Sequence, residues 1–300
     1  MTTPGAEKSA DDSLEPTGAG AIAERVRRDD RDRFLCTLFA LPEHRDALLA
    51  LYAFHAEIAA VRDGVSEAMV GQLRLKWWYD AVPGIVAGTP PEHPVAVALA
   101  DAGRRHPLDA DDLRAMIEVR AQDLTPAQPA DMATLERYAE ATSGRLARTA
   151  LRMTGAAGAA PDAAVRGVAV AWALIGLVRA IPVHAARGYA YVPKAVCAEA
   201  GLDPDALSKV RRGSAPPAGL GAAVGTLRRR AAGHLDAARR VSPSYPRAAA
   251  PVFLQAVLCE VYARRLAARG DDPSAPVFAR PAPGTLATLR LAWSAYRRTY

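Results

Sequence analysis

The side chains that do chemistry in proteins occur here without any of the spacings that mark a common catalytic site. The chain has no Gly-rich phosphate loop, no dinucleotide fingerprint, no zinc-protease motif and no nucleophile elbow. Its six histidines lack metal-ligand spacing, so each is expected to be a solvated or core residue. The three cysteines are widely separated and include no Cys-x-x-Cys pair, which argues against a zinc site or a disulfide framework and is typical of a reducing compartment.

Basic residues are the commonest groups able to bind a ligand. Lys and Arg number 38 against 32 Asp and Glu, for a net charge of +6, and only four of the 38 are lysines. An arginine excess suits an anionic partner such as a diphosphate, a lipid headgroup or a nucleic acid, although the heavy use of alanine makes coding bias the simpler explanation. Arg228, Arg229 and Arg230, with Arg239 and Arg240, form one basic helix face. An ordinary solvated surface is its first interpretation and contact with anionic lipid the second; without a DNA- or RNA-binding motif, we expect no nucleic-acid partner.

Helical periodicity runs through almost the whole chain. We predict helices over residues 43–63, 66–87, 93–105, 132–153, 162–187, 194–200, 220–240 and 246–269, another capped by Asp109, and a final one through Leu286 and Trp293. No segment shows the alternation of a strand, so the chain is predicted to be an all-α bundle. Residues 1–22 lack periodicity and are predicted to be a disordered tail before one domain over residues 23–300. Trp77 and Trp78 are expected to pack in the core.

The first residues of the sequence do not have the pattern of a targeting signal. The first residues lack an apolar stretch and carry early acids, unlike a signal peptide, and they do not resemble a transit peptide. The longest apolar run, residues 167–178, is too short to cross a bilayer. We therefore expect a cytoplasmic protein, with a peripheral contact at the inner membrane as the alternative.

A set of short segments spread over the chain carries a more specific signal. In chain order they are Arg33-Phe34 with Phe39-Ala40-Leu41-Pro42 and Arg45, Leu51-Tyr52-Ala53-Phe54, His93-Pro94, Asp123-Leu124, Tyr138-Ala139 with Gly144, Ile175-Gly176-Leu177-Val178-Arg179, and Arg187-Gly188-Tyr189-Ala190-Tyr191-Val192-Pro193. Each alone is weak, but their order and spacing together resemble the squalene/phytoene synthase family of head-to-head prenyl synthases. The resemblance implies a single-domain helical bundle of the trans-isoprenyl diphosphate synthase type.

The resemblance also implies where a metal site should be. Active members of this family carry aspartates on two facing helices, where Mg²⁺ bridges them to the departing diphosphate. In the first motif the family has an aspartate pair and then a third aspartate, and this chain has Ala59, Ala60 and Asp63 at those positions.

The second motif has lost its carboxylates as well. The family's Arg-Asp-x-x-x-Asp aligns with Arg179, Ala180 and His184, and Pro182 stands inside the motif, where it would perturb the helix. Only one of the five aligned ligand positions keeps its acid. Because Mg²⁺ requires oxygen ligands, we expect no metal centre and no cofactor.

Several groups on the diphosphate side of the family's site persist. They are Arg45, Tyr52, Asp63, Arg179, Arg187 and Tyr191. A cavity for an apolar or diphosphate ligand is therefore compatible with the sequence. Glu57 and Asp123 are the other acids near the motifs, but Glu57 lies about 200° around the helix from position 59 and is expected to point elsewhere.

The longest matching segments belong to one branch of the family. They are Leu51–Glu57, Val65–Glu67, Gly71–Trp78 and Pro182–Gly188. In these segments the chain resembles a mitochondrial complex I assembly factor related to phytoene synthase, which also lacks the aspartate-rich motifs. The resemblance implies complex I subunits or assembly proteins as partners.

Two functions therefore remain open at the level of sequence. The first is a non-catalytic synthase-like protein that acts in complex I assembly or holds an isoprenoid, lipid or diphosphate ligand. The alternative is an active prenyltransferase of isoprenoid biosynthesis with an altered metal site, which would need Mg²⁺. A third class, a peripheral membrane-binding protein, would use the arginine-rich C-terminal helices.

Overall fold

The computed structural model describes residues 18–65, 67–125, 127–278 and 284–300. Within these residues the regular elements are helices, and one isolated β-bridge joins Ser244 to Thr299. The all-α prediction is confirmed. Residues 1–17, which make up most of the segment predicted as a disordered tail, lie outside the described residues.

The helices follow one another closely along the chain. The α-helices are α1 (Ala19–Asp29), α2 (Arg31–Thr37), α3 (Pro42–Ala60), α4 (Ala68–Ala87), α5 (Pro94–Gly103), α6 (Ala110–Leu124), α7 (Met132–Ala139), α8 (Arg145–Met153), α9 (Asp162–Arg179), α10 (Ile181–Ala186), α11 (Lys194–Glu199), α12 (Pro204–Leu207), α13 (Leu220–Val241), α14 (Ala250–Ala267) and α15 (Thr285–Arg297). A π-helical turn, η2 (Glu140–Gly144), joins α7 to α8, and 3₁₀ turns lie at η1 (Arg62–Gly64), η3 (Arg247–Ala249) and η4 (Pro276–Phe278).

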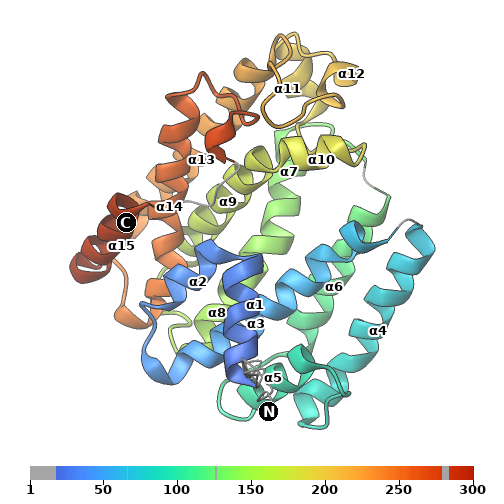
Figure 1. Cartoon of the computed structure of the whole chain (residues 1–300). Coiled ribbons are helices and arrows are strands. Elements are labelled where there is room, and N and C mark those ends of the chain that lie inside the picture. Colours follow the sequence, from blue (N-terminus) through green and yellow to red (C-terminus); the bar gives the residue numbers. More distant parts are fainter. Residues whose placement is uncertain (1–17, 66, 126, 279–283) are drawn as a thin grey trace, which may run out of the picture.

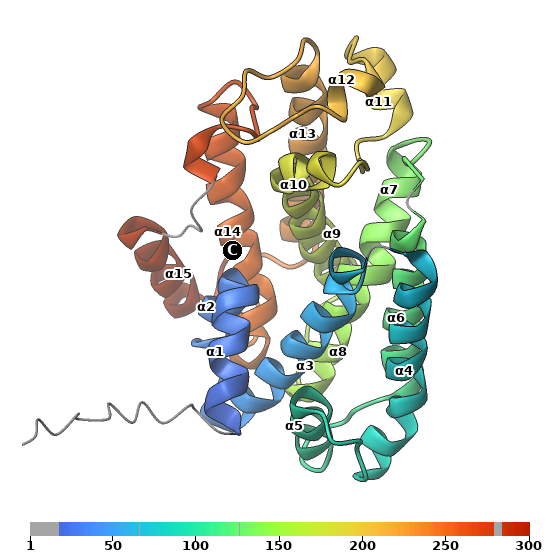
Figure 2. The ribbon, with the colours of Figure 1, turned by 45° about the vertical axis from the view of Figure 1, so that its right-hand side comes forward.

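Helix α9 runs through the middle of the bundle (Figure 1). Its buried residues occur on all sides of the helix, which is typical of a core helix. Helices α13 and α14 pack along it. Helix α3 packs against α1 and α5, and α4 pairs with α6 at the edge farthest from α15 (Figure 2). The segments that resemble the synthase motifs, at the ends of α3 and α9, thus belong to central helices.

Helix α1 begins inside the segment that the sequence predicts to be a tail. Residues 19–22 form its first turn, and Ile22 and Val26 are buried against the core. Ile22 and Val26 are the only large apolar residues of this helix, and they lie four residues apart on one face. Its packing against α3 and α5 stabilises it, because short helices depend on tertiary contacts.

The predicted helix over residues 162–187 is two helices in the structure. Helix α9 ends at Arg179, and α10 begins at Ile181. Pro182 has no N–H with which to continue the helical ladder to the carbonyl group of Val178, so the chain breaks at Ala180. The expectation that Pro182 perturbs this segment is therefore confirmed.

The expectation for the two adjacent tryptophans is half wrong. Trp78 is 4% exposed and packs in the core, whereas Trp77 is 43% exposed. Neighbouring residues on a helix point about 100° apart, and α4 buries only the face that contains Trp78.

The lengths of the helices and the state of the cysteines bear on two further expectations. Among the described residues, no helix is both long enough and apolar enough to cross a membrane. Cys36, Cys197 and Cys259 are buried and free, as the sequence predicts.

The close approach of α9 and α13 depends on Gly167. A Cβ atom at this position would lie 2.8 Å from the backbone oxygen of His234 and 3.0 Å from the Cβ atom of Ala238. We expect Gly167→Ala to lower the free energy of unfolding by about 1–3 kcal/mol, because the two helices would have to separate. Gly176 is the matched control, since a Cβ atom there meets nothing within 4 Å. Gly176→Ala should raise stability by about 0.5–1 kcal/mol. Chemical denaturation of both variants measures the difference, and equal changes would contradict the packing argument.

Candidate functional site

The four motif positions without a carboxylate lie at helix ends. They are Ala59 and Ala60 at the end of α3, Ala180 between α9 and α10, and His184 in α10. The segments that follow these helices are joined by an ion pair, in which Arg187 Nη1 lies 2.6 Å from Asp63 Oδ1. The structure therefore brings the two motif segments together.

Asp63, the one aligned acid that remains, is held by protein groups. Besides the pair with Arg187, it accepts a hydrogen bond of 3.5 Å from the hydroxyl group of Tyr189. The guanidinium group of Arg62 lies over the ring of Tyr189, 5.4 Å from its centroid. This carboxylate is therefore balanced by arginine on a partly exposed surface.

Asp123 lies at the centre of a buried network. Its carboxylate accepts hydrogen bonds from the hydroxyl groups of Tyr191, at 2.5 Å, and Tyr138, at 2.8 Å, and from Arg120 Nη1 at 3.2 Å. The two tyrosine rings stack with their centroids 5.2 Å apart. Burial raises the pKa of Tyr138 to about 12 and raises that of Tyr191 as well. Both tyrosines are thus protonated donors at neutral pH.

The same network extends to α3 through Arg120. Its Nη2 atom lies 3.0 Å from Nε2 of His55. An arginine can only donate, so Nε2 of His55 is the unprotonated nitrogen. Burial, with Arg120 and Arg33 nearby, holds the pKa of His55 well below its usual value. His55 is therefore a neutral acceptor.

His184, at one of the aligned acid positions, forms part of an aromatic cluster. Its ring stacks on Tyr189 with centroids 4.8 Å apart and meets Tyr191 edge-on at 5.1 Å. Burial lowers the pKa of His184 to about 4, with Arg187 adding to this effect and Asp123 opposing it. A neutral aromatic ring thus takes the place of an acid.

A second buried network surrounds Arg179. Its Nη1 atom lies 3.1 Å from Oδ2 of Asp32, and its guanidinium carbon lies 3.5 Å from the ring centroid of Tyr262. The hydroxyl group of Tyr262 lies 2.9 and 2.8 Å from the two oxygens of Asp32, to which it donates. Burial raises the pKa of Asp32, with the positive charge of Arg179 opposing the rise. Arg179 is therefore committed to an intramolecular partner.

Tyr52 is a buried residue near the middle of α3. Its hydroxyl group has no hydrogen-bond partner among the described residues, and burial raises its pKa. The guanidinium carbon of Arg33 lies 5.7 Å from the Tyr52 ring centroid. Arg33 itself bonds to Asp30 at 2.6 Å and to the hydroxyl group of Ser143 at 3.2 Å. The Tyr52 ring thus packs beside an arginine whose charge is already paired.

Arg45 is not brought to this site. It is exposed, and it donates to the backbone carbonyl groups of Ala40, at 3.2 Å, and Leu38, at 3.1 Å. These bonds hold the turn between α2 and α3. Of the six residues predicted on the diphosphate side, the structure links Asp63, Arg187 and Tyr191 through Tyr189 and the ion pair. Arg179 and Tyr52 have separate partners, and Arg45 lies elsewhere.

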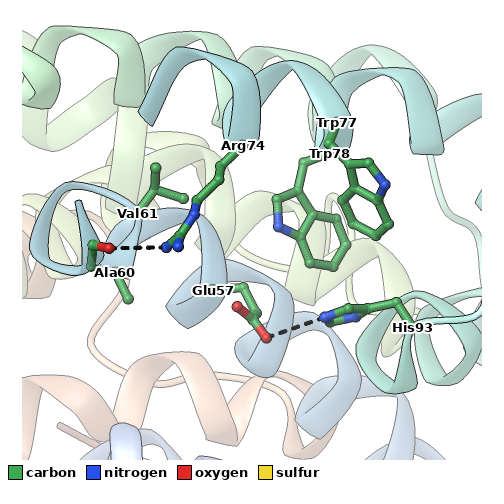
Figure 3. Close-up of a pocket in the computed structure, with 8 residues that line it drawn as sticks. Glu57, Ala60, Val61, Arg74, Trp77, Trp78 and His93 are labelled. Carbon is green, nitrogen blue, oxygen red and sulfur yellow. Dashed lines mark hydrogen bonds and ion pairs between the residues drawn. The ribbon is translucent and has the colours of Figure 1, made fainter. Parts of the chain in front are cut away.

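A cavity of about 440 Å³ lies at the end of α3, beside the motif position Ala60 (Figure 3). Its lining includes Glu57, Trp78 and His93. Glu57 lies 2.6 Å from Arg25 and 3.7 Å from Nε2 of His93. Ala60, one of the aligned motif positions, lines the same cavity three residues from Glu57, so the expectation that Glu57 points elsewhere is wrong for this position. Arg74 closes one end by donating to the carbonyl oxygen of Gly64 at 3.2 Å.

Comparisons with known proteins identify the fold and the family. A model of the squalene/phytoene synthase family matches residues 26–297. The chain belongs to the squalene/phytoene synthase family. A mouse protein, "NADH dehydrogenase (ubiquinone) complex I, assembly factor 6", is 32% identical to this chain. The match covers 81% of this chain and 72% of the mouse protein. The human protein of the same name is 29% identical over 99% of this chain and 89% of its own length.

A solved structure confirms the squalene/phytoene synthase architecture. A dehydrosqualene synthase superimposes with a TM-score of 0.76, covering 93% of this chain and 95% of the other, at 15% identity. At this identity the likeness shows the fold alone.

The donors around the family's metal position do not fit Mg²⁺. The ion needs several oxygen ligands with free lone pairs in octahedral array. Asp63 is paired with Arg187, and the oxygens of Asp123 face three donors. No group of three or more His, Cys, Asp or Glu residues within the described part of the chain is arranged to hold a metal ion. The acids that remain are therefore already neutralised by protein groups.

Sequence reasoning missed several members of the two networks. Arg120 lies three residues before Asp123, a spacing that places both on one helix face and is a usable signal for an ion pair. Asp32 and Tyr262 are far apart in the chain, and nothing in their local sequence indicates that they meet.

The two aspartates that remain near the motif positions should differ in their effect on stability. Asp123→Asn removes the charge partner of a buried arginine, so we expect the free energy of unfolding to fall by about 3–5 kcal/mol. Asp63→Asn breaks a partly exposed pair, and the loss should be at most about 1 kcal/mol. Urea denaturation at neutral pH compares the two. Equal losses would show that burial does not govern these pairs.

His184 should make the protein sensitive to acid. Its folded pKa of about 4 lies below the unfolded value of 6.5. Its neutral form therefore supports folding fully above pH 6.5, and this support is lost as the pH falls from about 6.5 to about 4. His184→Phe keeps the stacked ring but cannot take up a proton, so it should lose about 3 kcal/mol less stability over this range. Denaturation midpoints at several pH values test this, and identical pH profiles would refute it.

Proposed function

We propose that this protein is a non-catalytic member of the squalene/phytoene synthase family that acts in the assembly of respiratory complex I. The observation that carries the proposal is the pairing of Asp63 with Arg187, together with the missing carboxylates at Ala59, Ala60, Ala180 and His184. Both segments that would form the metal site lie together, but protein cations balance the acid that remains.

The similarity to complex I assembly factor 6 of mouse and human supports the assembly role. It extends over most of this chain. Prenyl transfer, in contrast, requires that a diphosphate be neutralised as it leaves. Arg179, the arginine expected to meet that diphosphate, is held by Asp32 and Tyr262. A ligand would have to displace these partners.

The cysteines support a cytoplasmic location as part of the proposal. All three are buried and form no disulfide. Proteins of reducing compartments typically keep their cysteines in this state. The partners proposed here are complex I subunits or other assembly proteins, contacted through the surface of the molecule.

The activity of the purified protein separates the proposal from its alternative. Incubation with farnesyl or geranylgeranyl diphosphate and Mg²⁺ should give no squalene, phytoene or cyclopropyl diphosphate intermediate. An active squalene synthase assayed in parallel is the positive control. Steady turnover that Arg179→Ala abolishes would overturn the non-catalytic assignment and support an active transferase.

A deletion strain of the source organism tests the assembly role itself. NADH:ubiquinone oxidoreductase activity in its membranes should fall several-fold, while its carotenoid and hopanoid content stays unchanged. Reintroducing the wild-type chain should restore the activity. Loss of isoprenoid products with normal oxidoreductase activity would contradict the proposal.

A further inference from the structure

Helix α15 presents its apolar side to solvent. Leu286 is 79% exposed, Leu289 61%, Trp293 63% and Tyr296 79%. Steps of three, four and three residues place these four side chains on one face of the helix. The opposite face, with Ala287, Leu291 and Ser294, is buried against the bundle. A surface helix usually has the reverse arrangement, so this face is suited to contact something apolar outside the molecule.

Unpaired arginines border this apolar face. Arg290, Arg297 and Arg298 are exposed, and within the described residues none of them forms an ion pair with a carboxylate. The guanidinium carbon of Arg297 lies 5.7 Å from the Trp293 ring. Arg45 and Arg247 line the same hollow as Tyr296 and Arg298. After Asp272 the sequence contains no Asp or Glu at all. The charged side chains on α15 and at its C-terminal end are therefore all arginines.

The basic face considered first from sequence behaves differently. On α13, Arg228 pairs with Asp271, Arg230 with Glu136, and Arg239 with Glu260. These arginines neutralise acids of the protein itself. Arg229 and Arg240 of the same face are exposed and form no ion pair with a carboxylate among the described residues, so some free positive charge remains on α13. What distinguishes α15 is that its free arginines border exposed leucine, tryptophan and tyrosine side chains.

The combination of side chains selects a lipid surface over a protein partner. Leucine, tryptophan and tyrosine on one face, with arginines along its borders, are typical of a helix that lies in the plane of a membrane interface. Thirteen residues give a length of about 20 Å, less than the roughly 30 Å of a hydrocarbon core, so α15 would lie flat. The segment that contains α15 carries no Asp or Glu, so its own side chains do not repel an anionic surface.

We propose that α15 docks this protein on anionic membranes, with Leu286, Leu289, Trp293 and Tyr296 entering the interface and Arg290, Arg297 and Arg298 contacting lipid phosphates. Figures 1 and 2 both show α15 at one edge of the bundle, outside α14, where a flat surface can approach it. The inference does not depend on the assembly role, because it concerns lipid alone.

Co-sedimentation of the full-length protein with vesicles tests the proposal. We expect binding at low salt to vesicles of phosphatidylcholine with phosphatidylglycerol, weaker binding to phosphatidylcholine alone, and release from the anionic vesicles as salt rises. The double variant Leu289→Gln with Trp293→Gln should bind about tenfold or more weakly, because it loses two inserting side chains. Arg290→Gln with Arg297→Gln should also bind about tenfold more weakly and show less dependence on salt.

A second exposed apolar stripe provides the matched control. Met69 and Leu73 of α4 are 69% and 64% exposed, close to the values for α15. Met69→Gln with Leu73→Gln should leave vesicle binding unchanged. All these residues are exposed, so circular dichroism should show unaltered folding in every variant.

Three outcomes would overturn the proposal. One is failure of the wild-type protein to bind anionic vesicles at low salt. Another is equal binding by the wild-type protein and the Leu289→Gln, Trp293→Gln variant. The third is a dimer in light scattering that this variant dissolves while vesicle binding is absent, which would assign α15 to contact between copies of the chain. Oxidoreductase activity in the deletion strain reports on the assembly role separately.

Discussion

A buried carboxylate requires donors, and the carboxylate of Asp123 sets the geometry of the part of the candidate site that contains Asp63 and His184. Its three donors come from different parts of the chain: Arg120 from α6, Tyr138 from α7, and Tyr191 from the segment after α10. Satisfying one acid therefore fixes that segment against two helices. The position of this segment in turn allows Arg187 to form its ion pair with Asp63 and the ring of Tyr189 to stack on that of His184.

The electrostatic balance of the site differs from that of a metal centre. A cluster of aspartates repels itself, and divalent cations remove the repulsion. Here each remaining acid has an arginine: Asp63 has Arg187, Asp123 has Arg120, and Asp32 has Arg179. The three pairs are neutral without any metal. A diphosphate entering such a site would compete with carboxylates already in place, which is the physical reason that the retained arginines are weak evidence for catalysis.

The sequence predicted the features that depend on local pattern. The helices, the cap at Asp109 and the effect of Pro182 all follow from periodicity and backbone chemistry, and the structure contains them. The exposed position of Arg45 and the contact between Asp32 and Tyr262 depend on how distant segments meet, which no local pattern encodes. Helix α1 was missed because only two large apolar residues, Ile22 and Val26, mark its buried face, and its stability comes from their packing against the bundle.

The exposed apolar stripes also constrain how the molecule can meet other surfaces. Helices α15 and α4 lie at opposite edges of the bundle in both views (Figures 1 and 2). The two stripes therefore lie on helices at separate edges of the molecule. The two stripes differ in charge as well: Lys76 beside the α4 stripe pairs with Asp80, whereas the arginines of α15 have no carboxylate partner among the described residues. Charge, more than apolar area, is what distinguishes the edge suited to anionic lipid, since both stripes expose similar side chains.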